Sequence, residues 1–207
     1  GINKIIVSDN FTNGNEVKKF EHKFAKYNNK KYCVAVSSGT SALFLALKSL
    51  GININDEIIT TSLSFVATPM SVNYLKAKPI FVDIDPATWN IDIDKIEKKI
   101  TKKTKAIIPV HLYGKSCDME KIIKIAKKYK LKVIADSAQA PGIKYNKKYC
   151  GTISELGGLS LNYHKHIHTG EGGVVFTNNI NLSKKVKMLR NHGENIVSKN
   201  SNEFLNN

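Results

Sequence analysis

The fold of this chain is decided by residues 34–47, which read VAVSSGTSALFLAL. The first three residues have the apolar, β-branched character of a buried strand, and residues 37–41 form a tight polar turn around Gly39. The apolar remainder begins a helix. Because the first N–H groups of a helix have no partner within it, the turn aims N–H groups and hydroxyls at an anion.

Apolar runs of strand length alternate with amphipathic stretches along the rest of the chain. Strands are expected over 32–36, 57–61, 79–83, 105–110, 131–135 and 173–177, and helices over 16–27, 40–49, 65–76, 92–100, 118–129 and 180–190. Such repeats predict an α/β fold of three layers, a mostly parallel sheet with helices on both faces. Residues 1–193 are expected to form this domain. Residues 194–207 are polar and rich in asparagine, and are expected to lack a core of their own.

The composition argues against a nucleic-acid-binding protein. The formal net charge of +15 arises from 32 basic and 17 acidic residues, and Arg190 is the single arginine. The lysines are scattered over predicted helix faces and loops, whereas a nucleic-acid binder more often clusters its charge and uses arginine. The same charge would steer an anionic sugar nucleotide toward the protein.

The cysteines and the hydropathy indicate a soluble, cytoplasmic protein. Cys33, Cys117 and Cys150 lack the spacing of metal ligands, and one thiol is left over if two of them pair. This usage favours a reducing compartment. No apolar stretch has the length that a membrane span needs.

Several candidate site residues follow predicted strands or lie in connecting loops. They are Ser38, Phe65, Asp136 and Lys165. Ligands of parallel sheets bind beyond the carboxyl ends of the strands, so these residues are expected to converge.

Two of these residues suggest a particular cofactor. Residues 160–173, SLNYHKHIHTGEGG, isolate Lys165 in a polar, glycine-flanked turn, where a lysine can form a Schiff base. Asp136 ends a predicted buried strand, and a buried carboxylate needs a cation. Pyridoxal phosphate (PLP) supplies one in its protonated ring nitrogen, and its chemistry needs such a lysine, an acidic partner and a phosphate cradle.

Each candidate also has a purely structural interpretation. Asp136 is compatible with an ordinary turn or helix cap, and Gln139 with a cap of the turn that follows it. Ser38 and Thr40 are compatible with helix caps, which use the same N–H groups that would bind a phosphate. Phe65 is compatible with a core residue.

The histidines around Lys165 invite a metal hypothesis. His164, His166 and His168 alternate, as in an extended segment that exposes one face. No carboxylate or thiol completes a ligand set, so no metal site is expected.

A series of motifs in a fixed order carries a resemblance to a known family. The motifs are SSGTSALFLAL, IITTSLSFVAT, AKPIFVDIDPATWNID, TKAIIPVHLYGKSCDM, VIADSAQAPG and TGEGG. With them the chain resembles the DegT/DnrJ/EryC1/StrS family of PLP-dependent sugar aminotransferases. The resemblance implies the large domain of the aspartate aminotransferase-like fold type I, with PLP as cofactor. It also implies a nucleotide-linked keto-deoxy sugar as substrate, glutamate as amino donor, no metal, and a homodimer in the complete family member.

The resemblance also implies roles for individual residues. Lys165 matches the lysine that binds the cofactor covalently and moves the proton during transamination. Asp136 matches the partner of the pyridinium nitrogen, and Gln139 matches the residue that approaches the ring hydroxyl. Phe65 matches the aromatic residue that stacks on the ring. The phosphate is implied to lie against Ser38, Gly39, Thr40 and Ser160.

The chain departs from the family in length. Members run well beyond 207 residues and have a smaller carboxyl-terminal domain, which is expected to be missing here. The chain is therefore a fragment, a natural truncation or half of a split enzyme, and a non-catalytic remnant is an alternative.

The sequence leaves two alternatives to transamination. A branch of sugar dehydratases that resembles this family carries histidine at the lysine position, and a shift of one residue would place His164 or His166 there. Counting back from Gly170 puts Lys165 in register, which favours the aminotransferase. A dinucleotide site is a weaker option, because residues 37–41 lack its glycine spacing.

Overall fold

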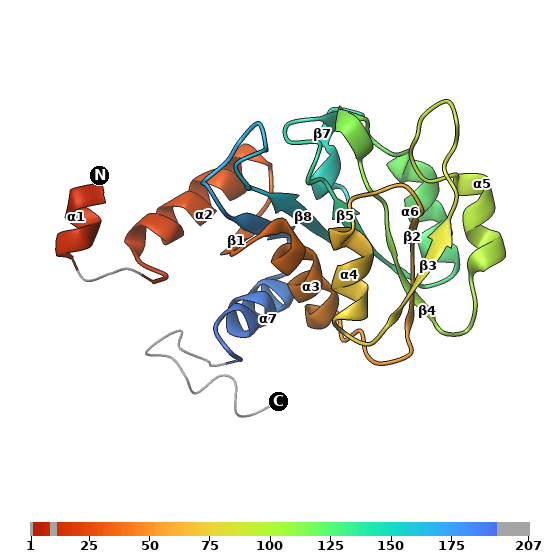
Figure 1. Cartoon of the computed structure of the whole chain (residues 1–207), viewed down its shortest axis with the longest axis horizontal. Helices are drawn as coiled ribbons and strands as arrows, with labels where there is room; N and C mark the ends of the chain where they lie inside the picture. The colour runs from red at the N-terminus through yellow and green to blue at the C-terminus, as the bar shows by residue number, and fades with distance from the viewer. Residues whose placement is uncertain (1, 9–11, 194–207) are drawn as a thin grey trace.

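A computed structural model describes residues 2–8 and 12–193 of the chain (Figure 1). Within them seven strands form one sheet, in the order β1-β9-β8-β5-β4-β2-β3. The strands are β1 (Tyr32–Val36), β2 (Glu57–Thr61), β3 (Lys78–Val82), β4 (Thr104–Ile108), β5 (Lys132–Asp136), β8 (Leu156–Ser160) and β9 (Gly173–Thr177). All neighbours from β8 to β3 pair in parallel, and β9 runs antiparallel to β8 and β1. The mostly parallel sheet predicted from the sequence is confirmed.

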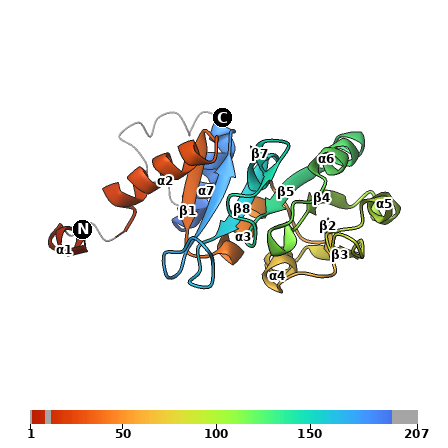
Figure 2. The same ribbon diagram turned by 90° about the horizontal axis from the view of Figure 1, so that it is seen from above.

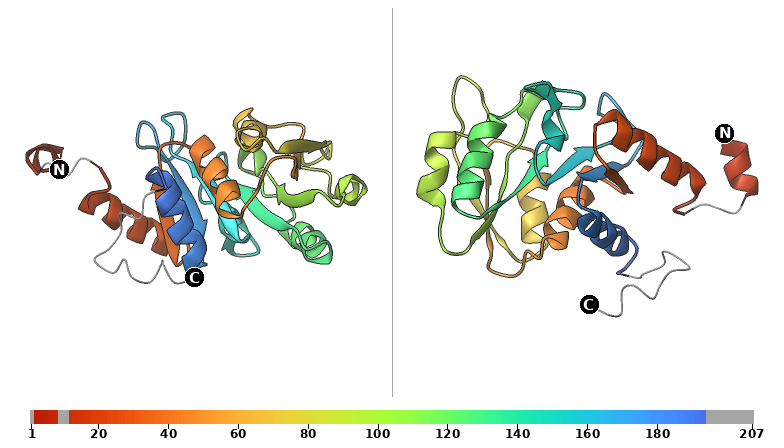
Figure 3. Two further views of the ribbon diagram at one scale, coloured as in Figure 1. Left: turned by 90° about the horizontal axis from the view of Figure 1, so that it is seen from below. Right: turned by 180° about the vertical axis from the view of Figure 1, so that it is seen from behind.

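Helices cover both faces of this sheet, which confirms the predicted three layers. The face nearest the viewer in Figure 1 carries α3 (Gly39–Ser49), α4 (Ala67–Asn73) and α7 (Ile180–Arg190). The opposite face, seen from behind in Figure 3, carries α2 (Asn15–Tyr27), α5 (Ile93–Ile96) and α6 (Met119–Lys128). Figure 2 shows the layers from above.

The apolar core lies on the two faces of the sheet. On the first face α3 packs between the sheet, α4 and α7, and Leu47 and Val72 are fully buried there. On the second face Met119 and Ile122 of α6 pack against Ile107 of β4. Because α3 lies centrally on the sheet, its first turn is held close to the strand ends where ligands bind.

The structure corrects the sequence prediction at several elements. The pattern does not predict β8, because Leu156-Gly-Gly-Leu159 lacks β-branched residues. Its glycines allow close packing, since a Cβ added to Gly157 would lie 1.7 Å from the carbonyl oxygen of Gly151. The helix expected over 65–76 is shorter, and the one expected over 92–100 ends as a 3₁₀ turn, η1 (Glu97–Lys99).

Some short elements are also absent from the sequence prediction. They are α1 (Ile2–Val7), the hairpin of β6 (Lys144–Tyr145) and β7 (Lys148–Tyr149), and the 3₁₀ turns η2 (Leu112–Gly114) and η3 (Cys150–Thr152). The prediction for residues 194–207 lies outside the described residues. In the part of the chain that the structure describes, no helix has the length and apolar character needed to cross a membrane.

The single arginine stabilises the fold through an ion pair and hydrogen bonds. Arg190 of α7 donates one nitrogen to the carboxylate of Glu21 in α2 at 2.7 Å and to the carbonyl oxygen of Ala35 in β1 at 2.8 Å. The buried Glu21 also accepts the N–H of Ala35 at 2.9 Å. The ion pair therefore joins two helices to an edge strand of the sheet, and the charges compensate each other in the interior.

Candidate active site

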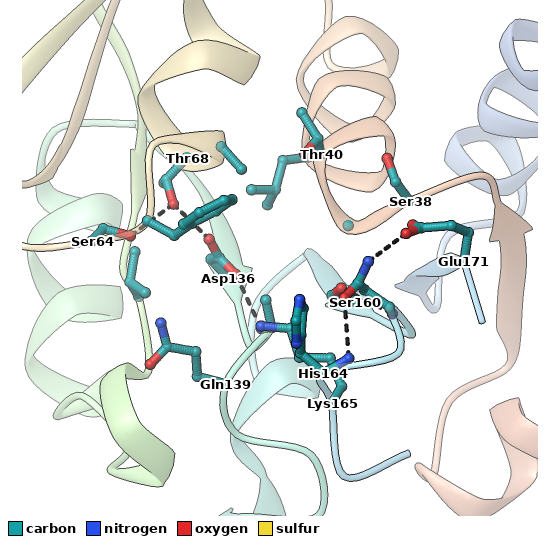
Figure 4. Close-up of a pocket in the computed structure, with 17 residues that line it drawn as sticks. Ser38, Thr40, Ser64, Thr68, Asp136, Gln139, Ser160, His164, Lys165 and Glu171 are labelled. Carbon is teal, nitrogen blue, oxygen red and sulfur yellow. Dashed lines mark hydrogen bonds between the residues drawn. The ribbon is translucent and has the colours of Figure 1, made fainter. Parts of the chain in front are cut away.

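A cavity of about 380 Å³ lies at the carboxyl ends of the parallel strands (Figure 4). Its volume falls in the range of small-molecule sites. The start of α3, the start of α4, the end of β5 and the loop after β8 enclose it. It brings together all the residues singled out from the sequence, namely Ser38, Gly39, Thr40, Phe65, Asp136, Gln139, Ser160 and Lys165. Their roles stay predictions.

The first turn of α3 forms one wall of this cavity. Ser38 is the N-cap, and its hydroxyl accepts the N–H of Ser41 at 3.0 Å. The N–H groups of Gly39 and Thr40 belong to the first turn and have no acceptor within the helix. The helix dipole adds partial positive charge at the same point, so this wall suits an anion such as a phosphate.

Two glycines allow the end of β8 and the start of β9 to pack against the first turn of α3. A Cβ on Gly39 would lie 2.7 Å from the Cβ of Ser160, and a Cβ on Gly173 would lie 2.3 Å from the carbonyl oxygen of Ser38. Any larger residue would push β8 and β9 away from the helix. The hydroxyl of Ser160 is therefore held beside the N–H groups of α3 because both glycines lack a side chain.

Asp136, at the end of β5, is the buried carboxylate of the cavity. It is 4% exposed, and its two oxygens accept the hydroxyl of Thr68 at 2.8 Å and the N–H of Ala138 at 3.1 Å. Burial raises the pKa of this carboxyl, while these two hydrogen bonds and the nearby charge of Lys165 act to lower it. Among the described residues, no cation forms an ion pair with Asp136. A cationic ring nitrogen would complete this environment.

Thr68 is a member of the site that sequence reasoning missed. It is 1% exposed, and its hydroxyl lies 2.9 Å from that of Ser64. A threonine hydroxyl has one proton, which Thr68 donates to Asp136, so Ser64 must donate to Thr68. Figure 4 shows this chain of hydrogen bonds running from Ser64 to the carboxylate. The four-residue spacing places both hydroxyls at the helix start, but no sequence signal directs Thr68 toward Asp136.

Lys165 differs from the histidines around it. It is partly buried and lines the cavity, whereas His166 and His168 are exposed and do not line it. His164 is exposed and lies at the rim. The segment is the polar turn expected from the sequence, because the N–H of Lys165 donates to the carbonyl oxygen of Asn162 at 2.9 Å, so the alternation of the histidines does not reflect an extended segment. In residues 2–8 and 12–193 no cluster of three potential metal ligands occurs.

The structure also bears on the structural interpretations of Phe65 and Gln139. Phe65 is 70% exposed at the edge of the cavity, so its interpretation as a core residue is wrong. The side-chain oxygen of Gln139 accepts the N–H of Tyr113 at 2.9 Å, in the loop after β4. Gln139 therefore joins two loops of the cavity edge.

His111 lies behind Asp136 and was not singled out from the sequence. It is fully buried, its Nδ1 accepts the N–H of Cys117 at 3.1 Å, and its backbone N–H donates to the carbonyl oxygen of Asp136 at 2.9 Å. Burial lowers the pKa of His111 to about 4. The imidazole is therefore neutral at physiological pH and accepts the N–H of Cys117, while the backbone of His111 supports that of Asp136.

Comparisons with known proteins agree with this geometry. The model of the DegT/DnrJ/EryC1/StrS aminotransferase family matches residues 1–206. GDP-perosamine synthase of Escherichia coli O157:H7 is 47% identical over 180 residues, which cover 87% of this chain and 50% of that protein. Among other curated relatives is a dTDP-3-amino-3,6-dideoxy-alpha-D-galactopyranose transaminase of Aneurinibacillus thermoaerophilus, 43% identical over 93% of this chain and 53% of its own length.

A solved structure shows the same fold with a related sequence. NtdA from Bacillus subtilis with bound cofactor PMP has a TM-score of 0.90 and 41% identity, over 96% of this chain and 45% of that chain. The chain spans about half the length of the curated relatives it matches. The family match over nearly the whole sequence, the identities and the shared fold together show that this chain belongs to the DegT/DnrJ/EryC1/StrS aminotransferase family.

Proposed function

We propose that this chain forms the cofactor-binding part of a PLP-dependent aminotransferase that transfers an amino group from glutamate to a nucleotide-linked keto-deoxy sugar. The observation that carries the proposal is the partly buried Lys165 on one wall of a cavity whose other walls hold a buried carboxylate and a helix N-terminus. The names of the relatives support the substrate class, since they include a GDP-perosamine synthase and a dTDP-amino-sugar transaminase.

The residues present fit PLP on three counts. Asp136 is a buried carboxylate that lacks a cation in the described residues, the start of α3 is a cradle for an anion, and Phe65 offers an exposed flat ring. When bound, PLP supplies an aldehyde that combines with amines and a ring that accepts electrons from the bond being broken.

The chain's own residues would act on protons and charge. Asp136 would hold the ring nitrogen in its protonated form, with Thr68 and Ala138 keeping the carboxylate ionised and oriented. Lys165 would hold the cofactor covalently until the amino donor replaces it. Its free amine would then act as general base and take the proton from the α carbon of glutamate.

The second candidate function is sugar dehydration. A solved Escherichia coli GDP-4-keto-6-deoxy-D-mannose-3-dehydratase with bound hydrated PLP has a TM-score of 0.82 and 34% identity, over 91% of this chain and 49% of that chain. A dehydratase would need a histidine where Lys165 lies. Lys165 is partly buried in the cavity wall, whereas His164 lines the cavity but is exposed and His166 does not line it, which supports transamination.

The test is covalent labelling of the purified protein. PLP is added, the absorbance spectrum is recorded, borohydride is used to fix the adduct, and the labelled peptide is mapped. We expect the label on Lys165 and its absence from Lys165→Ala. The aminotransferase then requires ¹⁵N from labelled glutamate in the sugar product. Loss of water without nitrogen uptake would indicate the dehydratase. A folded protein that forms no covalent adduct with PLP would indicate a remnant or half of a split enzyme.

We further propose that the complete protein works as a homodimer in the cytoplasm, as family membership suggests. Light scattering of the purified protein tests the dimer.

A further inference from the structure

We infer that Trp89 and Tyr113 form a stacking platform for the base of the nucleotide-linked substrate. The identity of the ligand rests on the proposed function. Trp89 lies in the loop after β3 and Tyr113 in η2 after β4, so both lie at the same sheet edge as the cavity. Their rings meet edge to face, with centroids 5.9 Å apart. They are 53% and 69% exposed, which leaves broad aromatic surface open.

Both residues have an unfavourable backbone conformation. The φ angle is +62° at Trp89 and +51° at Tyr113, in the left-handed region that bulky residues rarely adopt. Such conformations persist where the surroundings impose them, and they concentrate at functional sites. Two exposed aromatic residues in this state, in contact with each other, therefore point to a use for their rings.

A network of hydrogen bonds imposes this arrangement. The buried Asn90 accepts the N–H of Leu112 at 3.2 Å and donates to the carbonyl oxygen of Lys115 at 3.1 Å, which fixes one loop against the other. The carbonyl oxygen of Asp85 accepts the N–H of Trp89 at 2.7 Å. The platform is thus built in advance, so a ligand would not need to order it.

The platform is connected directly to the cavity. The N–H of Tyr113 donates to the side-chain oxygen of Gln139, which lines the cavity with Asp136 and Lys165. In Figure 4 Gln139 lies on the side of the cavity away from Ser38 and the start of α3. A sugar that reacts at Lys165 can therefore extend past Gln139 and place its nucleotide on the platform without competing for the phosphate cradle.

Stacking is tolerant of base identity, because every base has a π face. We therefore expect the platform to bind uridine, guanosine and thymidine diphosphates with affinities within about tenfold of one another. Discrimination between them would come from other contacts.

Trp89 is the single tryptophan of the chain, so its fluorescence reports on the platform. The protein is titrated with UDP, GDP or dTDP, before and after PLP is attached, and Trp89 emission is followed with correction for nucleotide absorbance. Inorganic pyrophosphate serves as the control ligand. Saturable quenching by the nucleotides and none by pyrophosphate is the expected result.

Variants connect the signal to the platform. Tyr113→Ala should weaken nucleotide binding tenfold or more, and Tyr113→Phe should retain it. Tyr74→Ala is the matched control, because Tyr74 is 57% exposed, contacts Phe44 and caps the end of α4 opposite to the one that lines the cavity. Isothermal calorimetry with Trp89→Ala, which lacks the probe, should show the same loss.

Three results of these ligand titrations would overturn the inference. They are equal quenching by pyrophosphate, unchanged affinity in Tyr113→Ala, and no nucleotide signal in protein that carries PLP on Lys165. A fourth result would assign the platform to a second copy of the chain and so overturn the inference. It is a shift of Trp89 emission with protein concentration in the absence of ligand, which the Tyr113→Ala variant does not show. Absence of PLP from Lys165 would instead refute the proposed function.

Discussion

Replacement of Thr68 by valine tests whether the hydroxyl chain to Asp136 maintains the cofactor site. The Thr68 hydroxyl donates to the Asp136 carboxylate at 2.8 Å and acts to lower its pKa, against the effect of burial. A hydrogen bond to a charged group contributes about 1.5–3 kcal/mol. Thr68→Val should therefore raise the pKa of Asp136 further and weaken its interaction with a cationic ring nitrogen by up to the same energy.

The consequence is weaker binding of PLP. Because the ring nitrogen needs an ionised partner, we expect the Kd for PLP to rise about 10- to 100-fold at neutral pH. A carboxyl with a higher pKa ionises at higher pH, so the deficit should shrink as the pH is raised. The assay is absorbance titration with PLP across a pH series.

Two further variants make the test specific. Thr68→Ser keeps the hydroxyl and should bind PLP within a few fold of the wild type. Ser64→Ala removes only the outer, neutral hydrogen bond, which contributes about 1 kcal/mol, and should have an effect of roughly fivefold. Thermal unfolding confirms that each variant is folded. A folded Thr68→Val that binds PLP as the wild type does at every pH would refute the reasoning.

Three other outcomes follow from the site. Because burial raises the pKa of Asp136, the cofactor-free protein loses stability as the pH rises through that pKa. Asp136→Asn should therefore raise the Tm of the cofactor-free protein at pH 8 and weaken PLP binding. A lower Tm in this variant would contradict the reasoning. His111 has a pKa near 4 in the folded state and 6.5 as its ordinary value, so stability should fall by up to about 3 kcal/mol as the pH decreases through this window. Urea unfolding at pH 7 and pH 4.5 should show less of this loss in His111→Gln, and an equal loss would exclude His111 as its source. Gly39→Ala places a Cβ 2.7 Å from that of Ser160 and should cost about 1–3 kcal/mol by overpacking. The added change Ser160→Gly should restore Tm but not PLP affinity, and failure to restore Tm would place the strain elsewhere.

Local pattern was sufficient for much of the fold and for part of the candidate site. Alternating apolar strands and amphipathic helices determined the α/β class, because the two elements bury their faces with different periods. The turn at Ser38 and Gly39 was recognisable because a strand, a polar turn and a helix start follow one another directly. Lys165 was recognisable in a polar, glycine-flanked turn, and the family resemblance put it in register by its distance from Gly170.

The misses depend on contacts between distant segments. Strand β8 forms although Leu156-Gly-Gly-Leu159 has low strand propensity, since its glycines pack against Gly151 and Leu43. Thr68 reaches Asp136 across 68 residues of sequence, and no local signal predicts such a partner.

By itself, then, the sequence determined the fold class, because periodicity acts locally, and it placed Ser38, Phe65, Asp136 and Lys165 after predicted strands or in connecting loops; Gln139 and Ser160 were implied by the family resemblance. Only the tertiary structure decided that Phe65 is exposed, that Thr68 holds Asp136, and that His111 is buried and neutral. These properties are set by burial and by partners from other segments, and the free energy of burying a charge or a ring depends on all the elements packed around it.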